Sequence, residues 1–310
     1  MLTDKERVFA VLNGRPVDRF PVAVPYIMLL QQDHWCELTG QPAWTWYEWL
    51  HQDPTEHVRV YEDFDRQLPF DILQPQRAPG RAQRENSEFV HRDGRHYRRD
   101  RHTGQMHLLN EDLPNSNAAA NEARSVFDQA DAKRLVQVLP AERILEDGHY
   151  DFVREAVRVF GERKFLMNGV TGTFWQCTFY LGETNLFLLL HEDPELIEYL
   201  SDRLLERTIE EIRALAASGH DAIYIDDALT TNDMISVAHY ERFSLPRVKA
   251  MVNEIHRLGK KAMLIYFGGV SDRIPQILSL GADALNVEAT MKSYVNDLGQ
   301  IQQQVGNRTC

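Results

Sequence analysis

The chain has 310 residues, of which 43% are hydrophobic and 26% are charged, as in ordinary globular proteins. Its formal net charge of −12 argues against a general role in binding nucleic acids or anionic membranes. No apolar stretch reaches the roughly 20 residues that a membrane span requires, and the charged first residues lack the apolar core of a signal peptide. The three cysteines, Cys36, Cys177 and Cys310, form no C-x-x-C pair. We therefore expect a cytoplasmic protein without a disulfide framework.

The first part of the chain predicts helices separated by short strands. Residues 3–6 have the spacing of a capping box, and Gly14 is well placed to end the helix that they begin. Residues 20–25, which are bounded by prolines, read as a first strand, and residues 70–73 as a second. The stretch between them, residues 29–67, is helical in character and contains a cluster of aromatic side chains.

A β-hairpin insertion is predicted near residues 88–109. Asp93-Gly94 lies between two runs of residues, which is the strongest short-range hairpin signal. The flanks of this turn are basic and contain Arg92, Arg95, Arg98, Arg99, Arg101, His91, His96 and His102. Such a hairpin is most often a solvated excursion from the main fold. The alternative is a flap whose cations meet an anionic ligand or an acidic partner.

Strands and helices alternate regularly after residue 150. The predicted strands are residues 164–169, 222–226, 262–266 and 284–288, and the predicted helices are residues 150–160, 173–218, 237–258 and 271–280. This alternation predicts βαβ units, a parallel sheet and right-handed crossovers. Residues 306–310 read as the beginning of a further strand, whereas a closed barrel needs eight. We predict one α/β domain over residues 1–310, a (β/α)8 TIM barrel that is truncated at its C-terminal end.

Two adjacent carboxylates, Asp226 and Asp227, follow the apolar run 222–225. Catalytic side chains of parallel α/β proteins gather at the carboxyl ends of the strands. These two acids are therefore candidates for an active site. The alternative is that one of them caps the turn or helix that follows.

Several segments resemble the uroporphyrinogen decarboxylase superfamily, and they occur in the same order. These segments are residues 13–22, 172–181, 192–195, 234–246 and 281–288. The superfamily consists of (β/α)8 barrels and also includes corrinoid-dependent methyltransferases that act on methylamines, methanol or aryl methyl ethers. The resemblance covers most of the chain. It implies an enzyme with a small-molecule substrate, and a homodimer, because family members are often dimers.

The arginine-rich motif by which the decarboxylases grip substrate carboxylates is missing, since residues 25–34 contain no arginine. Two other family positions are retained. Asp71 resembles the acid that meets the pyrrole nitrogens, and Tyr180 resembles the tyrosine beside it. The alternatives are a strand-end cap for Asp71 and a core aromatic for Tyr180.

The zinc ligands of the thiol-activating methyltransferases are also missing. Their His-x-Cys-Gly motif corresponds to residues 265–269, which contain neither histidine nor cysteine. The carboxylates of Asp226, Asp227 and Glu288 are a poor match to soft thiolate chemistry. We therefore expect no metal and no tightly bound cofactor. A corrinoid would be carried by a partner protein, since no Asp-x-His-x-x-Gly motif is present.

Polar groups at the predicted strand ends, with those implied by the resemblance, form the expected site. The expected catalytic residues are Asp71, Asp226, Asp227, Tyr266 and Glu288. The expected substrate-binding residues are Asn168, Trp175, Tyr180, Gly268 and Gly269. Neighbouring carboxylates raise one another's pKa and so can supply a general acid at neutral pH. The two glycines would let backbone amides approach a ligand, unless they form an ordinary strand-to-helix turn.

The preferred hypothesis is corrinoid-linked methyl transfer, in which such an acid protonates the oxygen of a small methylated substrate during demethylation. One alternative is decarboxylation of a tetrapyrrole or a related carboxylate, with Asp71 as the key acid. Another is a non-catalytic barrel that binds a tetrapyrrole or a partner. Neither nucleic acid nor membrane is an expected partner.

Overall fold

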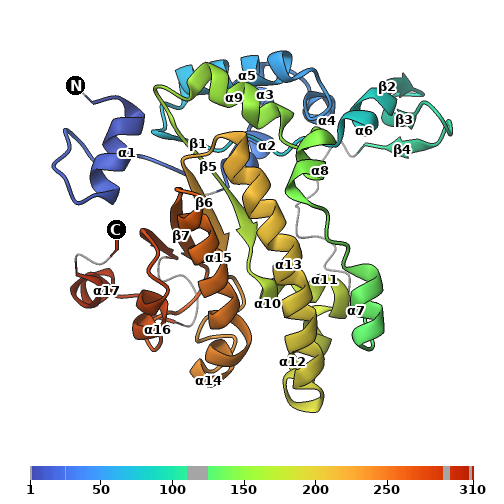
Figure 1. The fold of residues 1–310 in the computed structure, drawn as a ribbon. Coiled ribbons are helices and arrows are strands. Elements are labelled where there is room, and N and C mark those ends of the chain that lie inside the picture. The colour runs from blue at the N-terminus through green and yellow to red at the C-terminus, as the bar shows by residue number, and fades with distance from the viewer. Residues whose placement is uncertain (1, 25, 110–124, 289–293, 307–308) are drawn as a thin grey trace. The chain divides into compact units, whose positions relative to one another are not determined.

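A computed structural model describes the chain except for residues 1, 25, 110–124, 289–293 and 307–308 (Figure 1). The chain divides into two compact units. Unit 1 consists of Met1–Phe9, Val17–Ala118 and Glu142–Met167, and unit 2 of Ala10–Pro16, Ala119–Ala141 and Asn168–Cys310. Within the described residues, no helix has both the length and the apolar character that crossing a membrane requires.

Helices dominate the first part of unit 1. They are α1 (Asp4–Leu12), which continues into unit 2, α2 (Ile27–Asp33), α3 (Trp35–Thr39), α4 (Thr45–Trp49) and α5 (Pro54–Gln67). The predicted capping box forms at α1, because the Glu6 amide donates to Thr3 Oγ1 (3.2 Å) and the Thr3 amide donates to the Glu6 carboxylate (2.8 Å). Asp53 caps α5 by accepting a hydrogen bond from the Thr55 amide (2.9 Å).

The strand predicted at residues 20–25 is wrong for the part that the structure describes, since residues 20–24 have no regular structure. Their hydrogen bonds go elsewhere. The Val22 amide donates to the side chain of Asp71 (2.7 Å), and the Val22 carbonyl accepts from the Asp71 amide (2.8 Å). The side chain of Asp71 therefore takes the place of the neighbouring strand that a strand at residues 20–25 would have needed for its backbone hydrogen bonds.

The core of unit 1 is built around Trp49 and His57. The His57 ring is stacked between Trp49 (4.0 Å between centroids) and Phe152 (3.6 Å). His57 Nδ1 lies 3.0 Å from the Trp49 carbonyl, and Trp49 Nε1 donates to the His57 carbonyl (3.0 Å). Burial lowers the pKa of His57 to about 3, so the ring is neutral. Helix α9 (Asp151–Phe160), predicted from the sequence, supplies Phe152.

The predicted hairpin is confirmed and carries a third strand. After α6 (Arg81–Asn86), the antiparallel strands β2 (Ser87–Arg92), β3 (Arg95–Asp100) and β4 (Met106–Leu108) form a small sheet in that order. Asp93 (φ 53°) and Gly94 (φ 72°) form the turn between β2 and β3, as an Asp-Gly pair in a two-residue hairpin loop should.

The main sheet is parallel and has the strand order β1-β5-β6-β7-β8. Its strands are β1 (Ile72–Leu73), β5 (Phe165–Thr171), β6 (Ala222–Asp226), β7 (Lys261–Tyr266) and β8 (Ala284–Val287). In unit 1, β1 pairs with the first residues of β5. In unit 2, Cys310 lies beside β8, where its amide donates to the Asp283 carbonyl (2.9 Å) and its carbonyl accepts from the Leu285 amide (2.8 Å). The predicted beginning of a further strand therefore lies where expected, although residues 307–308 are outside the described part.

Helices of unit 2 cover one face of β6 and β7, with α13 and α15 nearest to these strands (Figure 1). The described helices are α7 (Gln129–Leu135), α10 (Thr173–Gln176), α11 (Thr178–Leu181), α12 (Glu183–Glu192), α13 (Pro194–Ser218), α14 (Val237–His239), the π-helix η1 (Tyr240–Ser244), α15 (Leu245–Arg257), α16 (Ile274–Ser279) and α17 (Leu298–Val305). Helix α8 (Ala141–Glu146) begins at the last residue of a unit 2 segment. Asp193 and Pro194 begin α13 and Gly219 (φ 108°) ends it, which are the signals that predicted these boundaries.

Candidate active site

Asp226 and Asp227 project to opposite faces of the sheet, because successive side chains of a strand alternate. Both carboxylate oxygens of Asp227 accept a hydrogen bond from Ser244 Oγ (2.9 and 2.8 Å), so Asp227 lies on the face that the helices cover. Asp226 shares the other face with Tyr224, whose ring lies against Gly169 of β5 so closely that a Cβ there would be 2.2 Å from it. The side chains of Asp226 and Asp227 therefore lie on different faces of the sheet, although both follow the end of the apolar run of β6.

A buried polar network occupies the helix-covered face around Asp227. Tyr266, at the end of β7, forms a hydrogen bond with Tyr240 of η1 (2.9 Å between the hydroxyl oxygens). The guanidinium of Arg273 lies 5.3 Å from the centre of the Tyr240 ring, and its Nη2 donates to the Ile235 carbonyl (2.7 Å). These four side chains are almost completely inaccessible.

Burial raises the pKa of Asp227 to about 7. Hydrogen bonds from Ser244 and Thr230 oppose this rise, and the charge of Asp226 adds to it. The pKa values of Tyr240 and Tyr266 are raised as well, mainly by burial. Asp227 therefore exchanges its proton near neutral pH. It is buried, however, and its hydrogen bonds with Ser244 connect the end of β6 to η1.

The π-helix explains why this network was not foreseen. Its wider turn directs both Tyr240 and Ser244 of η1 towards the strands, one to Tyr266 and the other to Asp227. Residues 234–246, which contain Ser244, resemble a segment of the superfamily, but no local sequence pattern predicts a π-helix. Sequence reasoning therefore missed Tyr240, Ser244 and Arg273.

Asp226 is nearly buried at the end of β6, with 3% of its surface exposed. Its Oδ1 accepts a hydrogen bond from the Ala228 amide (3.3 Å), which is the turn-forming contact considered as an alternative for one of these acids. Its backbone carbonyl accepts from the Gly172 amide (2.7 Å) and so fixes the segment that leads into α10.

Glu288 follows β8 directly, and its carboxylate accepts a hydrogen bond from the Tyr294 hydroxyl. Asn296 donates to both the Glu288 carbonyl (2.8 Å) and the Gly268 carbonyl (2.9 Å), which joins the ends of β7 and β8. Burial raises the pKa of Tyr294, and the Glu288 carboxylate raises it further. The phenol therefore remains a hydrogen-bond donor at neutral pH.

Gly268 and Gly269 allow a close approach of a protein loop. A Cβ at Gly268 would lie 2.1 Å from Thr231 Oγ1, and a Cβ at Gly269 would lie 1.9 Å from Asn232 Oδ1. The Gly269 amide donates to Asp233 Oδ1 (3.1 Å). These contacts account for both glycines through the packing of the loop after β6.

Tyr180 lies in a second polar cluster of unit 2, formed by α10, α11 and α13. Its hydroxyl accepts a hydrogen bond from Arg207 Nη1 (2.7 Å), and Arg207 Nη2 donates to Gln176 Oε1. Gln176 Nε2 in turn donates to the Thr171 carbonyl (2.6 Å) at the end of β5. The ring of Trp175 lies 6.3 Å from that of Phe179.

Two donors in this cluster lack a partner among the described residues. Arg207 Nε is buried and forms no hydrogen bond within that part of the chain. The Tyr180 hydroxyl accepts from Arg207 but has no acceptor there for its own proton. Arg207 and Gln176 were missed by the sequence reasoning, although Gln176 and Tyr180 have the i, i+4 spacing of side chains on one helical face. Asn168, on β5, accepts a hydrogen bond from the Gly169 amide (2.8 Å) through its Oδ1.

Asp71 belongs to unit 1 and is held by arginines. Its carboxylate accepts from Arg19 Nη1 (2.7 Å), Arg19 Nη2 (3.0 Å), the Val22 amide (2.7 Å) and Arg7 Nη1. Burial alone would raise the pKa of Asp71, but the hydrogen bonds from Arg19, Val22 and Arg7 outweigh it and lower that pKa. Asp71 is therefore ionised, and both of its oxygens are occupied by these donors.

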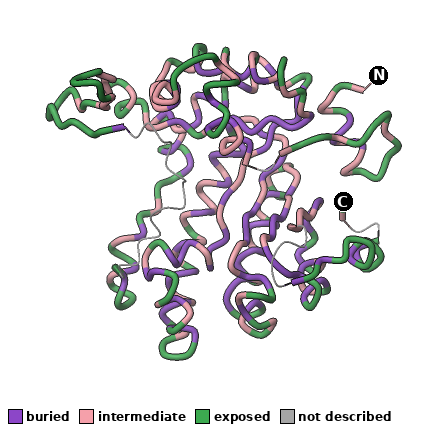
Figure 2. Tube along the Cα trace, turned by 180° about the vertical axis from the view of Figure 1, so that it is seen from behind, coloured by how far each residue is buried: buried purple, intermediate pink, exposed green. Residues whose placement is uncertain are grey.

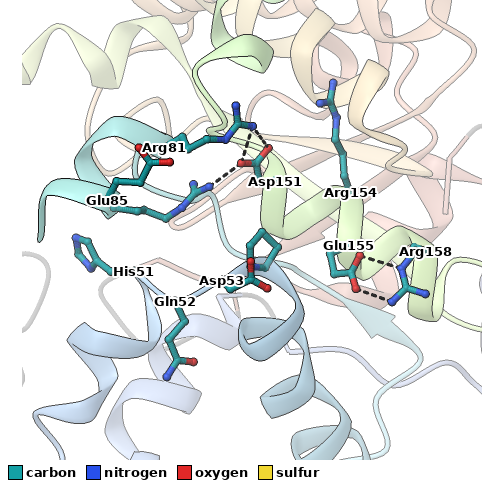
Figure 3. A pocket seen from close by; sticks show the side chains of 11 residues that line it. His51, Gln52, Asp53, Arg81, Glu85, Asp151, Arg154, Glu155 and Arg158 are labelled. Carbon is teal, nitrogen blue, oxygen red and sulfur yellow. Dashed lines mark hydrogen bonds and ion pairs between the residues drawn. The ribbon is translucent and has the colours of Figure 1, made fainter. Parts of the chain in front are cut away.

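A polar cleft of about 710 Å³ lies elsewhere in unit 1, between the start of α5 and helices α6 and α9 (Figure 3). Asp151 binds both Arg81 (3.0 Å) and Arg84 (2.6 Å), while Glu155 pairs with Arg158. The lining contains four arginines and four carboxylates, so the cleft has no preference for one sign of charge. None of the residues expected to be catalytic lines it.

Comparison with known proteins identifies the family. The model of the uroporphyrinogen decarboxylase (URO-D) family matches residues 115–310. The chain belongs to the URO-D family. Its relatives include the uroporphyrinogen decarboxylases of Tolumonas auensis, 25% identical over 175 residues (52% of this chain, 47% of the relative), and of Myxococcus xanthus, 31% identical over 104 residues (33% and 29%). The chain spans about half the length, or less, of these curated relatives.

A methyltransferase from Methanosarcina mazei has a similar structure, with a TM-score of 0.65 and 18% sequence identity. The similarity covers 100% of this chain and 82% of the methyltransferase. At this identity the comparison concerns the fold, and it confirms the predicted α/β barrel class for this URO-D chain. The family match includes the clusters around Asp227, Tyr180 and Glu288, whereas Asp71 precedes the matched residues.

Among the residues that the structure describes, no group of three or more His, Cys, Asp or Glu side chains is arranged to hold a metal ion. A cobalt ion near Tyr180 would likewise need a side chain that can coordinate it. Cys177, three residues earlier, is fully buried, and its thiol lies 3.3 Å from Ser201 Oγ. Burial raises the pKa of this thiol to about 12, so Cys177 does not suit a metal ligand.

Proposed function

We propose that this URO-D family enzyme removes a methyl group from the oxygen of a small methylated compound. The acceptor would be a corrinoid carried by a separate protein, because the sequence contains no Asp-x-His-x-x-Gly motif. That corrinoid would supply the nucleophile for the methyl carbon. The enzyme's own task is to bind the substrate and to stabilise the oxygen that the methyl group leaves.

The observation that supports this proposal is the pair of unused donors on Tyr180 and Arg207. When the C–O bond breaks, its electrons remain on the oxygen, which then needs a proton. Tyr180 is suited to give that proton, because Arg207 Nη1 holds its hydroxyl by donating a hydrogen bond to it and the O–H has no acceptor among the described residues. The Arg207 Nε–H is suited to stabilise the charge that develops on the oxygen.

The cationic guanidinium also bears on the choice of substrate. Arg207 would repel a methylammonium donor and attract a compound whose leaving atom becomes negative. We therefore propose methyl ethers or methanol, rather than methylated amines, as the substrate class. Solvent then restores the proton of Tyr180, which is only partly buried.

The assay is the change in the visible spectrum of free cob(I)alamin when the purified protein and a methyl donor are added, with methoxylated aromatics, methanol and methylammonium tested separately. We expect Tyr180→Phe to lower kcat/KM by about 10²–10⁴-fold, the usual contribution of a general acid. Tyr199→Phe is the matched control, since Tyr199 lies on α13 and contributes no hydrogen bond to this cluster among the described residues. A wild-type protein that leaves the cobalt spectrum unchanged with every donor would refute methyl transfer.

Decarboxylation is the second candidate, and the names of the curated relatives favour it. The saturation of Asp71 by Arg7, Arg19 and Val22 argues against it, since that carboxylate would have to turn to the pyrrole nitrogens. Chromatography of the porphyrins formed from uroporphyrinogen separates the two reactions. Loss of substrate carboxylates there, with no methyl transfer, would select the decarboxylase. If neither methyl transfer nor loss of carboxylates is detected, a non-catalytic binding role is favoured.

A further inference from the structure

A histidine lies on each side of the hairpin turn in unit 1. His91 of β2 and His96 of β3 are cross-strand partners, one position further from the turn than the pair Arg92–Arg95. The His96 carbonyl accepts a hydrogen bond from the Leu109 amide (2.8 Å), so the backbone groups of His96 point away from β2. The two histidines therefore form a non-hydrogen-bonded pair, the kind of cross-strand pair in which side chains lie closest together.

The two imidazole rings approach each other through the same nitrogen. Nδ1 of His91 lies 3.4 Å from Nδ1 of His96, and the ring centres are 4.5 Å apart with 53° between the ring planes. This separation is long for a hydrogen bond, whose donor–acceptor distance is usually about 2.7–3.2 Å. It matches the separation of two nitrogens in a tetrahedral zinc site, which is about 3.3–3.4 Å when each Zn–N bond is about 2.0–2.1 Å.

The same separation argues against metals that place neighbouring ligands at a right angle. Two nitrogens held in that way, each about 2.0–2.1 Å from the metal, would lie only about 2.9 Å apart. Square-planar copper(II) and nickel(II) sites need that smaller separation. Mg²⁺ and Ca²⁺ prefer oxygen ligands, whereas imidazole nitrogen is an ordinary ligand of Zn²⁺. Among common divalent cations, Zn²⁺ therefore fits this pair best.

One of the two rings is already held in position. The His96 ring is stacked on Trp44, with 4.1 Å between the ring centres and 10° between the planes. A ligand that is oriented before binding loses less conformational entropy when the metal arrives. His91 is exposed, and Figure 2 shows much of the hairpin as accessible, so an ion can reach the pair from solvent.

The arginines of the hairpin oppose the binding of a cation. Side chains alternate along a strand, so Arg92, Arg95 and Arg99 project to the face opposite the two histidines. Arg98, two residues after His96, shares the face of the histidines, and its charge repels a metal ion there. We therefore expect the affinity for a metal to rise when the charge of Arg98 is removed.

We propose that His91 and His96 bind a Zn²⁺ ion through their Nδ1 atoms. Both rings are then neutral and carry their proton on Nε2, which leaves each Nδ1 lone pair for the metal. Two protein ligands are fewer than the three or four of catalytic and structural zinc sites, so water completes the tetrahedron. The ion joins β2 to β3 and stabilises the hairpin. This site lies within unit 1 and does not depend on methyl transfer.

Isothermal titration calorimetry of the full chain with ZnCl₂ tests the proposal. His91→Gln and His96→Gln should each raise the Kd for Zn²⁺ at least about tenfold, because even the loss of a group that only supports a ligand costs about 10–100-fold. Arg98→Gln should lower the Kd, since it removes a repelling charge. His102→Gln is the matched control and should leave the Kd unchanged, because His102 is exposed and lies between β3 and β4, outside the pair.

Two further measurements identify the ligands and the effect on the hairpin. In nitrogen NMR spectra of the histidine rings, Zn²⁺ should shift the Nδ1 resonances of His91 and His96 together. Zn²⁺ should also slow the hydrogen exchange of residues 87–108 in the wild-type protein but not in His91→Gln, a replacement at an exposed position that keeps the stacking of His96 on Trp44.

Three results would each overturn this zinc site. The first is a wild-type protein that binds no Zn²⁺. The second is binding that His91→Gln and His96→Gln leave unchanged. The third is binding that His102→Gln weakens as much as His91→Gln does, because the ion would then be shared among surface histidines and bound adventitiously.

Discussion

Asp227 is a carboxyl group that its surroundings favour in the neutral form. It is completely buried and its pKa is about 7, compared with about 4 for an exposed aspartate. The folded protein therefore keeps this proton between pH 4 and 7, while the unfolded chain releases it. The stabilisation due to Asp227 is complete below about pH 4 and is lost as the pH rises through 7.

The Asp227→Asn variant should remove this dependence. Asn cannot ionise but can still accept a hydrogen bond from Ser244, so we expect the variant to be the more stable protein above pH 7, by roughly 1–4 kcal/mol. Urea unfolding measured at intervals from pH 4 to pH 8.5 provides the comparison. Asp33→Asn, at an exposed position on α2, is the control. Parallel pH profiles for wild type and Asp227→Asn would show that Asp227 is ionised in the folded state.

Asp71 represents the opposite case, an acid whose ionised form is needed. Its replacement by Asn leaves Arg7, which is buried, and Arg19 without their shared carboxylate. We expect Asp71→Asn to lower the free energy of unfolding by about 3 kcal/mol. Asp18→Asn, which removes a more exposed partner of Arg7, should cost less. Equal losses in urea unfolding would mean that burial of Asp71 does not matter.

Elements that carry their own boundary signals were predictable. Helix α13 begins at Asp193-Pro194 and ends at Gly219, and strand β6 is an apolar run that ends on an acid. The segment at residues 20–24 looked equally regular, but the side chain of Asp71 takes its hydrogen bonds. Tertiary contacts of this kind leave no trace in a local pattern.

The separation of Asp226 from Asp227 was within reach of the sequence, because strand alternation alone requires it. The partners of these acids were not. Ser244 binds Asp227 from a helix 17 residues away, and Tyr240 and Arg207 likewise bind Tyr266 and Tyr180 from 26 and 27 residues away; their directions depend on a π-helix and on helix packing. The sequence therefore identifies the site residues at the strand ends, but not those on the helices that face the strands.

Gly172, in the segment before α10, lies close to the end of β6. A Cβ at this position would lie 2.5 Å from Asp227 Oδ1 and 3.2 Å from the Asp226 carbonyl. The backbone of Gly172 is extended (φ −58°, ψ 142°), so Gly172→Ala introduces no dihedral strain and tests the contact alone. We expect a loss of about 2 kcal/mol in the free energy of unfolding from overpacking.

Gly299→Ala serves as the comparison for that experiment. Gly299 is the second residue of α17, where the nearest atom to an added Cβ would be Asp297 Oδ1 at 3.3 Å. Alanine in place of glycine in a helix should be neutral or stabilising by roughly 0.5–1 kcal/mol. If chemical denaturation finds Gly172→Ala no less stable than Gly299→Ala, the close approach to β6 is not a constraint.

At the scale of the whole molecule, the two units contain buried groups with opposite pH responses. In unit 1, burial lowers the pKa of His57 to about 3, so its stabilisation is complete above about pH 6.5 and is lost as the pH falls towards 3. In unit 2, Asp227 acts in the other direction. A falling pH should therefore loosen unit 1, and a rise of pH from 4 to 7 should loosen unit 2.

Hydrogen exchange with mass spectrometry can follow both units in one sample. Peptides from α5 and α9 should lose protection as the pH falls from 6.5 to 4.5, while peptides from β6 and α15 should lose it as the pH rises from 4 to 7, after correction for intrinsic exchange rates. His57→Phe keeps an aromatic ring between Trp49 and Phe152 and should abolish the acid response of unit 1. Protection that changes together in both units at every pH would mean that the chain opens as a single cooperative body.

The strand β6 places two identical residues next to each other under unrelated constraints. In a library that varies both codons, replacements of Asp227 should be limited to side chains that fit a sealed polar space against η1. Replacements of Asp226 should instead be limited by the function of the opposite face of the sheet. Evolution could therefore alter the chemistry on one side of this strand while the packing on its other side stays intact.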